Sequence, residues 1–222
     1  MADYPNTDFK MLGITSNIGE GQYVSESGVM QSRRYGAQRF SMTIEHAPLS
    51  KAEFMPVEGF LEGVRGRSGT FEIPLPYDSL SAVTGSPVTN GARARGSNSI
   101  PINNITAGLS NAFYAGDYIN FSTHAKAYKI VSTVNAGASE SILDETSGSI
   151  LDEVSGDILD ETTQQATVTI FPPLVEDLAD GSGVTYGSSF RFTVRQTGDI
   201  QTYNVEPPYI YAKQIDVTEY IA

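Results

Sequence analysis

Hydrophobic and polar residues alternate strictly along residues 38–46. Phe40, Met42 and Ile44 fall on one face of an extended chain, and the residues between them are polar or charged. This two-residue period predicts a β-strand with one buried face. The same period returns in residues 70–76, which predicts a second strand with a similar buried face.

The segment between these two strands has the pattern of a helix. Ser50 and Glu53 have the spacing of a capping box, in which each side chain binds the other residue's backbone N–H. Apolar residues then follow at helical spacing on one face: Phe54, Val57, Leu61 and Val64, with Phe60 beside them. We expect a short helix at about residues 50–65, with a kink or a 3₁₀-like first turn because Pro56 lacks a backbone N–H.

Short strand patterns follow one another in the middle of the chain, within residues 99–102, 117–121, 127–134 and 166–171. Asn90-Gly91 is the strongest signal for a two-residue hairpin. Many short strands with little helical pattern between them favour a small β-barrel or sandwich.

Long alternating segments return in the C-terminal part of the chain, and their hydrophobic faces need a partner. The sheet around residues 38–46 and 71–75 is the natural one. The fold class is therefore expected to be mainly β. Residues 1–80 with 184–222 are expected to form one β-rich domain, a β-sandwich with one short helix, and residues 81–183 an inserted β domain.

An acidic repeat lies inside that insert. Residues 141–164 contain three near-copies of an eight-residue motif built on Ile-Leu-Asp-Glu. From Glu140 to Glu161 there are eight acidic residues and no basic one, so most of the net charge of −12 belongs to this stretch. One interpretation is a stack of repeats that holds Ca²⁺, but the spacing matches no common Ca²⁺ loop. The other, which we favour, is an acidic loop extending the insert at residues 140–164.

Composition and motifs exclude several classes of function. The chain has no cysteine, which excludes disulfides and thiolate chemistry, and its acidity argues against binding nucleic acid through phosphate contacts. Neither a signal-peptide pattern nor an apolar stretch of membrane-spanning length is found. His46 and His124 have no second histidine at metal-ligand spacing, and no phosphate-binding or nucleophile-elbow motif occurs. We therefore expect no enzyme, no cofactor and no metal site.

Four further segments carry short motifs: 32–40 (SRRYGAQRF), 61–71 (LEGVRGRSGTF), 115–121 (AGDYINF) and 169–174 (TIFPPL). Together they resemble the distal tail proteins of tailed bacteriophages, which lie between the tail tube and the baseplate or tip. The resemblance implies a β-sandwich "belt" domain with a helix, which assembles into a sixfold ring, and a second β domain facing outward. It also implies a virion protein of the tail, assembled in the host cytoplasm.

The resemblance implies partners rather than substrates. These are identical copies in a hexameric ring and the tail tube and baseplate or tip proteins, with no readout of nucleic-acid sequence and no membrane insertion. Candidate interface residues are the arginines and the apolar residues of an N-terminal arm (residues 1–22): Arg33, Arg34, Arg65, Arg67, Phe9 and Leu12. Arg65 and Arg67 would equally suit a solvated helix end, where a positive charge is favourable beside the helix dipole.

Two alternatives remain. The chain could be a carbohydrate-binding β module of a virion or cell-surface protein, with tyrosines stacked on sugar rings. The candidates are Tyr77, Tyr114, Tyr118 and Tyr128, although aromatic residues at strand spacing are more often in a core. It could also be another ring or tube subunit of a phage tail.

Overall fold

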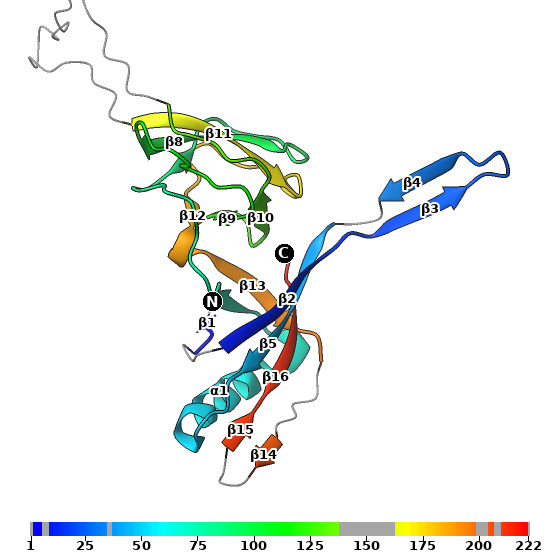
Figure 1. The fold of residues 1–222 in the computed structure, drawn as a ribbon, viewed down its shortest axis with the longest axis vertical. Coiled ribbons are helices and arrows are strands. Elements are labelled where there is room, and N and C mark those ends of the chain that lie inside the picture. The colour runs from blue at the N-terminus through cyan, green and yellow to red at the C-terminus, as the bar shows by residue number, and fades with distance from the viewer. Residues whose placement is uncertain are drawn as a thin grey trace, which may run out of the picture. The chain divides into compact units, whose positions relative to one another are not determined.

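The computed structural model describes residues 2–5, 9–34, 37–137, 163–198, 204–206 and 210–221. The chain is mainly β and contains one α-helix among these residues, which confirms the predicted fold class (Figure 1). It divides into two compact units, one made of Met1–Tyr77 with Arg191–Ala222 and the other of Asp78–Phe190. The predicted acidic extension at 140–164 lies almost entirely outside the described residues, so its interpretation stays a prediction.

The first unit is built on a six-stranded sheet in the order β1-β6-β13-β16-β5-β2. Phe40, Met42 and Ile44 are buried on one face of β5, as their alternation predicts. All neighbouring pairs are antiparallel except β1 with β6. The strands are β1 (Ala2–Asp3), β2 (Phe9–Asn17), β5 (Arg39–His46), β6 (Phe71–Pro74), β13 (Arg191–Gln196) and β16 (Gln214–Glu219). The C-terminal strand β16 lies between β5 and β13, so the end of the chain completes the sheet that its beginning starts.

Two further strand pairs belong to this unit. β3 (Glu20–Val24) and β4 (Met30–Arg34) pair with each other, as do β14 (Asn204–Glu206) and β15 (Ile210–Ala212). Leu49, just before the helix, bridges to Tyr211 in β15. The pair β14–β15 is therefore tied to the rest of the unit through the start of the helix.

The helix α1 (Lys51–Val64) begins with the predicted capping box, in which the backbone N–H of Ser50 donates to Glu53 Oε2 at 2.9 Å. Phe54, Val57 and Leu61 are buried, as predicted, because their spacing places them on one face. The Phe54 ring stacks on Tyr211 at 4.7 Å, which packs the helix against β15. The helix continues through Pro56, and its first turn combines a 3₁₀-type bond from the Glu53 N–H to the Ser50 carbonyl at 3.2 Å with an α-type bond from the Phe54 N–H to the same carbonyl at 3.0 Å. A separate 3₁₀ turn follows the helix at Gly66–Ser68.

The second unit is a nearly closed barrel with strand order β12-β9-β10-β11-β8-β7. These strands are β7 (Val88–Thr89), β8 (Ser99–Thr106), β9 (Tyr118–Phe121), β10 (Ala127–Ile130), β11 (Thr163–Phe171) and β12 (Val184–Tyr186). The two end strands meet at a bridge between Val88 and Gly183, beside which the Val184 N–H donates to the Pro87 carbonyl at 2.9 Å. The prediction that the first domain resumes at residue 184 is wrong for β12, because β12 pairs with β9 inside the barrel.

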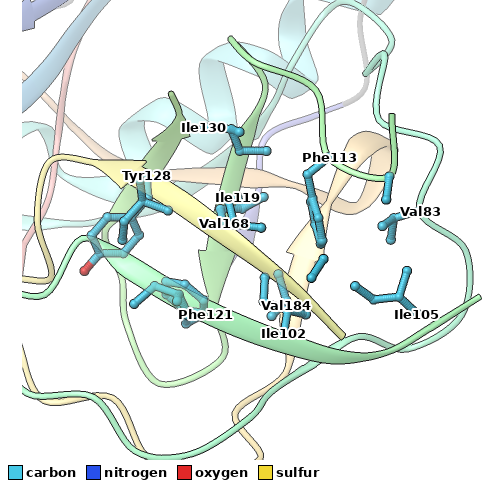
Figure 2. Close-up of a cluster of buried hydrophobic side chains, with 14 of the residues drawn as sticks. Val83, Ile102, Ile105, Phe113, Ile119, Phe121, Tyr128, Ile130, Val168 and Val184 are labelled. Carbon is cyan, nitrogen blue, oxygen red and sulfur yellow. The ribbon is translucent and has the colours of Figure 1, made fainter. Parts of the chain in front are cut away.

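The barrel interior is filled by side chains from all its longer strands. Figure 2 shows Ile102, Ile119, Phe121, Val168 and Val184 turned toward one another inside the barrel. These side chains are at least nine-tenths buried. The short strands of the barrel thus enclose a hydrophobic core of their own, separate from the hydrophobic cluster next to α1.

Both connections between the units are fixed to the start of β9. Asp117 Oδ2 accepts hydrogen bonds from Ser79 Oγ at 2.6 Å, Ser81 Oγ at 2.6 Å and the Ser81 backbone N–H at 2.8 Å, all in the chain that enters the barrel. The next residue, Tyr118, packs its ring at 5.8 Å from Phe190, in the chain that leaves it. Two consecutive residues therefore hold the entry and the exit of the barrel.

Candidate functional site

The β3–β4 hairpin is closed by a glycine turn. The Gly28 N–H donates to the Ser25 carbonyl at 2.8 Å, and the Ser25 N–H donates to the Val29 carbonyl at 3.0 Å. Gly28 has a φ of +80°, a left-handed conformation that glycine adopts without a steric penalty. Tyr23 pairs with Gln31 and Val24 with Met30, which fixes which side chains share a face.

Apolar side chains are exposed on both faces of this hairpin. Val24 and Met30 lie directly opposite each other on one face, and Tyr23 and Val29 lie on the other because successive side chains alternate. Tyr23 is 66% exposed and Met30 64% exposed. Of the ten exposed large hydrophobic residues among those described, five lie between Ile18 and Met30. A two-stranded ribbon cannot bury both of its own faces, so these side chains need a partner surface.

Sequence reasoning missed this apolar group. It placed Arg33 and Arg34 at an interface, and the structure puts both on β4, where Arg33 pairs with Gly21 and is exposed. The side chain of Arg34 lies outside the described residues. The sequence feature that could have indicated this group is an apolar residue on each face of a short strand next to a turn. A strand with apolar residues on both faces is typically covered by other parts of a protein on both faces.

The other two arginines predicted at an interface, Arg65 and Arg67, lie at the C-terminal end of the helix. Arg65 is exposed and takes a left-handed conformation, with φ of 59°, as its backbone N–H donates to the Glu62 carbonyl. Arg67 Nε donates to the Thr197 carbonyl, just after β13. Arg67 therefore ties the helix end to the sheet of its own unit, which is a structural role that the interface interpretation did not include.

The predicted N-terminal arm is held by its own unit where the structure describes it. Residues 2 and 3 form β1 on the edge of the sheet, and Tyr4 is buried with its hydroxyl 2.6 Å from His46 Nε2. Phe9 packs edge-on against Tyr4 at 5.9 Å. Leu12 lies in β2, paired with Thr43, with its side chain outside the described residues. Phe9 is thus an intramolecular contact, and β2 as a whole forms the end strand of the sheet.

Two of the four tyrosines proposed to stack on sugars are buried: Tyr128 lies in the barrel core, and Tyr118 packs against Phe190. Tyr118 is 5% exposed and Tyr128 is fully buried, so their assignment as exposed platforms is wrong. Tyr77 is half-exposed and Tyr114 is partly buried. A strand-like sequence pattern does not by itself reveal which side of a closed barrel a tyrosine faces.

Neither histidine lies on the surface. Burial, and secondarily the positive charge of Lys213, lowers the pKa of His46. His124 Nδ1 lies 2.9 Å from the Tyr128 hydroxyl inside the barrel. In the described part of the chain, no group of three or more histidine, cysteine, aspartate or glutamate residues could hold a metal ion, and no helix there is long and apolar enough to cross a membrane.

A scan against protein-family models gives no match to this chain, and a search of curated proteins gives none either.

Proposed function

We propose that this protein is a structural subunit of a bacteriophage tail, forming a homo-oligomeric ring that joins the tail tube to the distal baseplate or tip. The observation that carries the proposal is the β3–β4 hairpin, which exposes apolar side chains on both faces. The motifs that resemble distal tail proteins give the class of assembly, and the hairpin gives it a physical driving force.

The driving force is burial of apolar surface against another copy. Covering a side chain such as Met30 or Val24 completely stabilises an interface by about 1.5–3 kcal/mol. Because each copy carries the same hairpin and the same receiving surface, a head-to-tail contact can repeat from copy to copy, and it forms a closed ring when the rotation between neighbours returns to the first copy. Six copies is the number that the resemblance implies.

Charge and strand edges support the same assembly. The exposed Arg33 on the hairpin suits a hydrogen-bonded ion pair with a carboxylate of a neighbouring copy. The end strand β2 pairs on one side only within the described residues, which leaves backbone groups for an adjoining strand. These features fit a subunit whose surfaces are completed by its neighbours.

Two pairs of substitutions test the proposal, one for each hairpin face: Val24→Ser with Met30→Ser, and Tyr23→Ser with Val29→Ser. We expect the unmodified protein to form closed rings in negative-stain micrographs, and the pair on the contacting face to shift the mass measured by light scattering to that of a monomer. The control is Val131→Ser, which removes a similarly exposed apolar side chain from the barrel and should leave the rings intact.

Circular dichroism establishes that the substituted proteins keep their β structure. The proposal fails if the unmodified protein stays monomeric at high concentration, including with its tube partner present. It also fails if both hairpin pairs assemble like the unmodified protein.

A further inference from the structure

A groove of about 400 Å³ opens on the barrel where its two end strands meet. One wall is formed by residues 85–88 and the other by residues 183–189, with Ser122 completing the lining. A volume of this size lies within the range of small-molecule sites in proteins. All of its lining residues belong to the barrel unit.

The groove exists because backbone pairing across the barrel seam ends at Pro87 and Val184 on this side. The end strands share one bridge, Val88 with Gly183, and the next backbone bond runs from the Val184 N–H to the Pro87 carbonyl. Further along, Tyr186 reaches the opposite wall only through its hydroxyl, 3.4 Å from the Gly85 carbonyl. The walls thus separate beyond the last backbone bond.

The lining is uncharged and rich in hydroxyl groups. Six of its residues carry a hydroxyl: Ser86, Ser122, Thr185, Tyr186, Ser188 and Ser189. Burial raises the pKa of the Tyr186 phenol, so this group also stays neutral at physiological pH. A hydroxyl both donates and accepts hydrogen bonds, whereas a phosphate, carboxylate or ammonium group would find no opposite charge here.

Tyr186 adds an apolar surface to these polar groups. Its ring is partly buried and packs against the barrel core, which holds it in place, while the residue also lines the groove. A ligand with hydroxyl groups around its edge and C–H groups on its faces matches a fixed ring flanked by hydroxyls. Sugars have this chemistry.

We propose that this groove is a binding site for a neutral saccharide, with the serine and threonine hydroxyls as hydrogen-bond partners and the ring of Tyr186 as the apolar wall. The site differs from the tyrosine platforms that the sequence suggested, because Tyr118 and Tyr128 are buried. It requires only the barrel surface and is independent of ring assembly.

The test uses the full chain labelled with ¹⁵N and three neutral probes, cellopentaose, maltopentaose and chitopentaose, with tri-galacturonate as the acidic comparison. We expect at least one neutral probe to shift the backbone amide signals of residues 86–88 and 185–189. We expect tri-galacturonate to bind about tenfold more weakly or not at all, since the lining lacks a cation.

Thr185→Trp places a large ring in the groove and should weaken binding by about tenfold or more. Val131→Trp is the matched control, because Val131 is exposed on the same unit but outside the lining, and should leave binding unchanged. The proposal is overturned if no neutral probe shifts these amides at millimolar concentration, if the shifts map elsewhere, or if the acidic probe binds best. These results come from the unmodified chain, so they decide the question even if Thr185→Trp does not fold.

Discussion

Gly69 follows the 3₁₀ turn after α1 with an ordinary φ of −96°, so its role is spatial rather than conformational. A β-carbon at this position would lie 2.1 Å from the carbonyl oxygen of Val64 and 2.8 Å from Val64 Cγ1. Backbone atoms cannot give way as a flexible side chain can. The absence of a side chain is therefore what lets the chain pass under the helix end and enter β6.

We predict that Gly69→Ala destabilises the protein by about 1–3 kcal/mol, the usual cost of overpacking. The measurement is the urea midpoint of unfolding followed by circular dichroism. The matched control is Gly59→Ala, at an exposed helix position where a β-carbon meets nothing within 4 Å. That change should stabilise the helix by up to about 1 kcal/mol, because alanine favours the helical backbone. Equal stability of the two variants would contradict this assignment.

His46 and Tyr4 form a buried pair, and burial favours the neutral form of the histidine. The Tyr4 hydroxyl lies 2.6 Å from His46 Nε2, and the two rings stack at 5.7 Å. Burial, and then the charge of Lys213, lowers the pKa of His46 in the folded protein. The unfolded chain therefore binds a proton at a higher pH than the folded one, near the ordinary histidine value of about 6.5.

Protonation of His46 therefore favours the unfolded chain. The folded protein keeps its full stability above about pH 6.5 and loses part of it as the pH falls below this value. We predict a lower thermal midpoint at pH 5.5 than at pH 7.5, and a smaller difference between the two in His46→Gln, which cannot take up the proton. An equal pH dependence in His46→Gln and the unmodified protein would assign the effect to other groups.

Burial of single side chains was the least predictable property at this scale. The alternation in residues 38–46 indicated which side chains of β5 are buried, because one face of an open sheet packs against the protein and the other is exposed to solvent. The same reasoning left Tyr118 and Tyr128 as possible surface groups. Their burial depends on partners distant in sequence, such as Phe190 for Tyr118, which no local pattern contains.

At the scale of elements, Asp117 is the main polar anchor of the chain entering the barrel. Its carboxylate is buried and accepts three hydrogen bonds from Ser79 and Ser81, while Ser81 Oγ in turn accepts the Tyr114 N–H at 2.9 Å. Hydrogen bonds to a carboxylate are stronger than those between neutral groups.

We predict that Asp117→Ala costs about 2–3 kcal/mol and frees the connecting segment, since several bonds to one charged group are lost together. The measurement is amide hydrogen exchange, which should become faster at Ser81 and Val83. Asp180→Ala is the control, because the exposed Asp180 accepts one N–H, from Gly91, at 2.6 Å; it should leave exchange at Ser81 unchanged. Unaltered protection of Ser81 in Asp117→Ala would show that the segment is held by other contacts.

Two local sequence signals, the capping box and the Asn90-Gly91 turn, differ in whether the structure forms what they predict, and the difference has a physical reason. The capping box before α1 uses residues three apart, so the sequence contains all its partners, and it forms as predicted. Asn90-Gly91 forms no two-residue hairpin, because β7 ends at Thr89 and β8 starts at Ser99. The segment between them is held instead by Asp180, Asp177 and a bridge from Arg93 to Leu178. Long-range hydrogen bonds overrode the local preference.

For the whole molecule, the sequence indicated a β unit interrupted by a second one, because alternating segments at both ends of the chain lacked partners in the middle. The pairing of β16 with β5 and β13 bears this out. It did not indicate the barrel seam, which joins Val88 to Gly183, since a single bridge between distant residues leaves no periodic trace. For the same reason β12 was assigned to the wrong unit, and the groove beside it had no sequence signal.

The entry and exit of the barrel have a consequence for how such a chain can evolve. A β-carbon on Gly187 would lie only 3.7 Å from that of Ser79, so the chain leaves the barrel beside the point where it enters. Joining such neighbouring ends takes a short peptide and costs little loop-closure entropy. Replacing the barrel by such a peptide would therefore leave the flanking strands β6 and β13 able to pair in the same sheet, which makes the barrel a unit that an insertion or deletion could exchange.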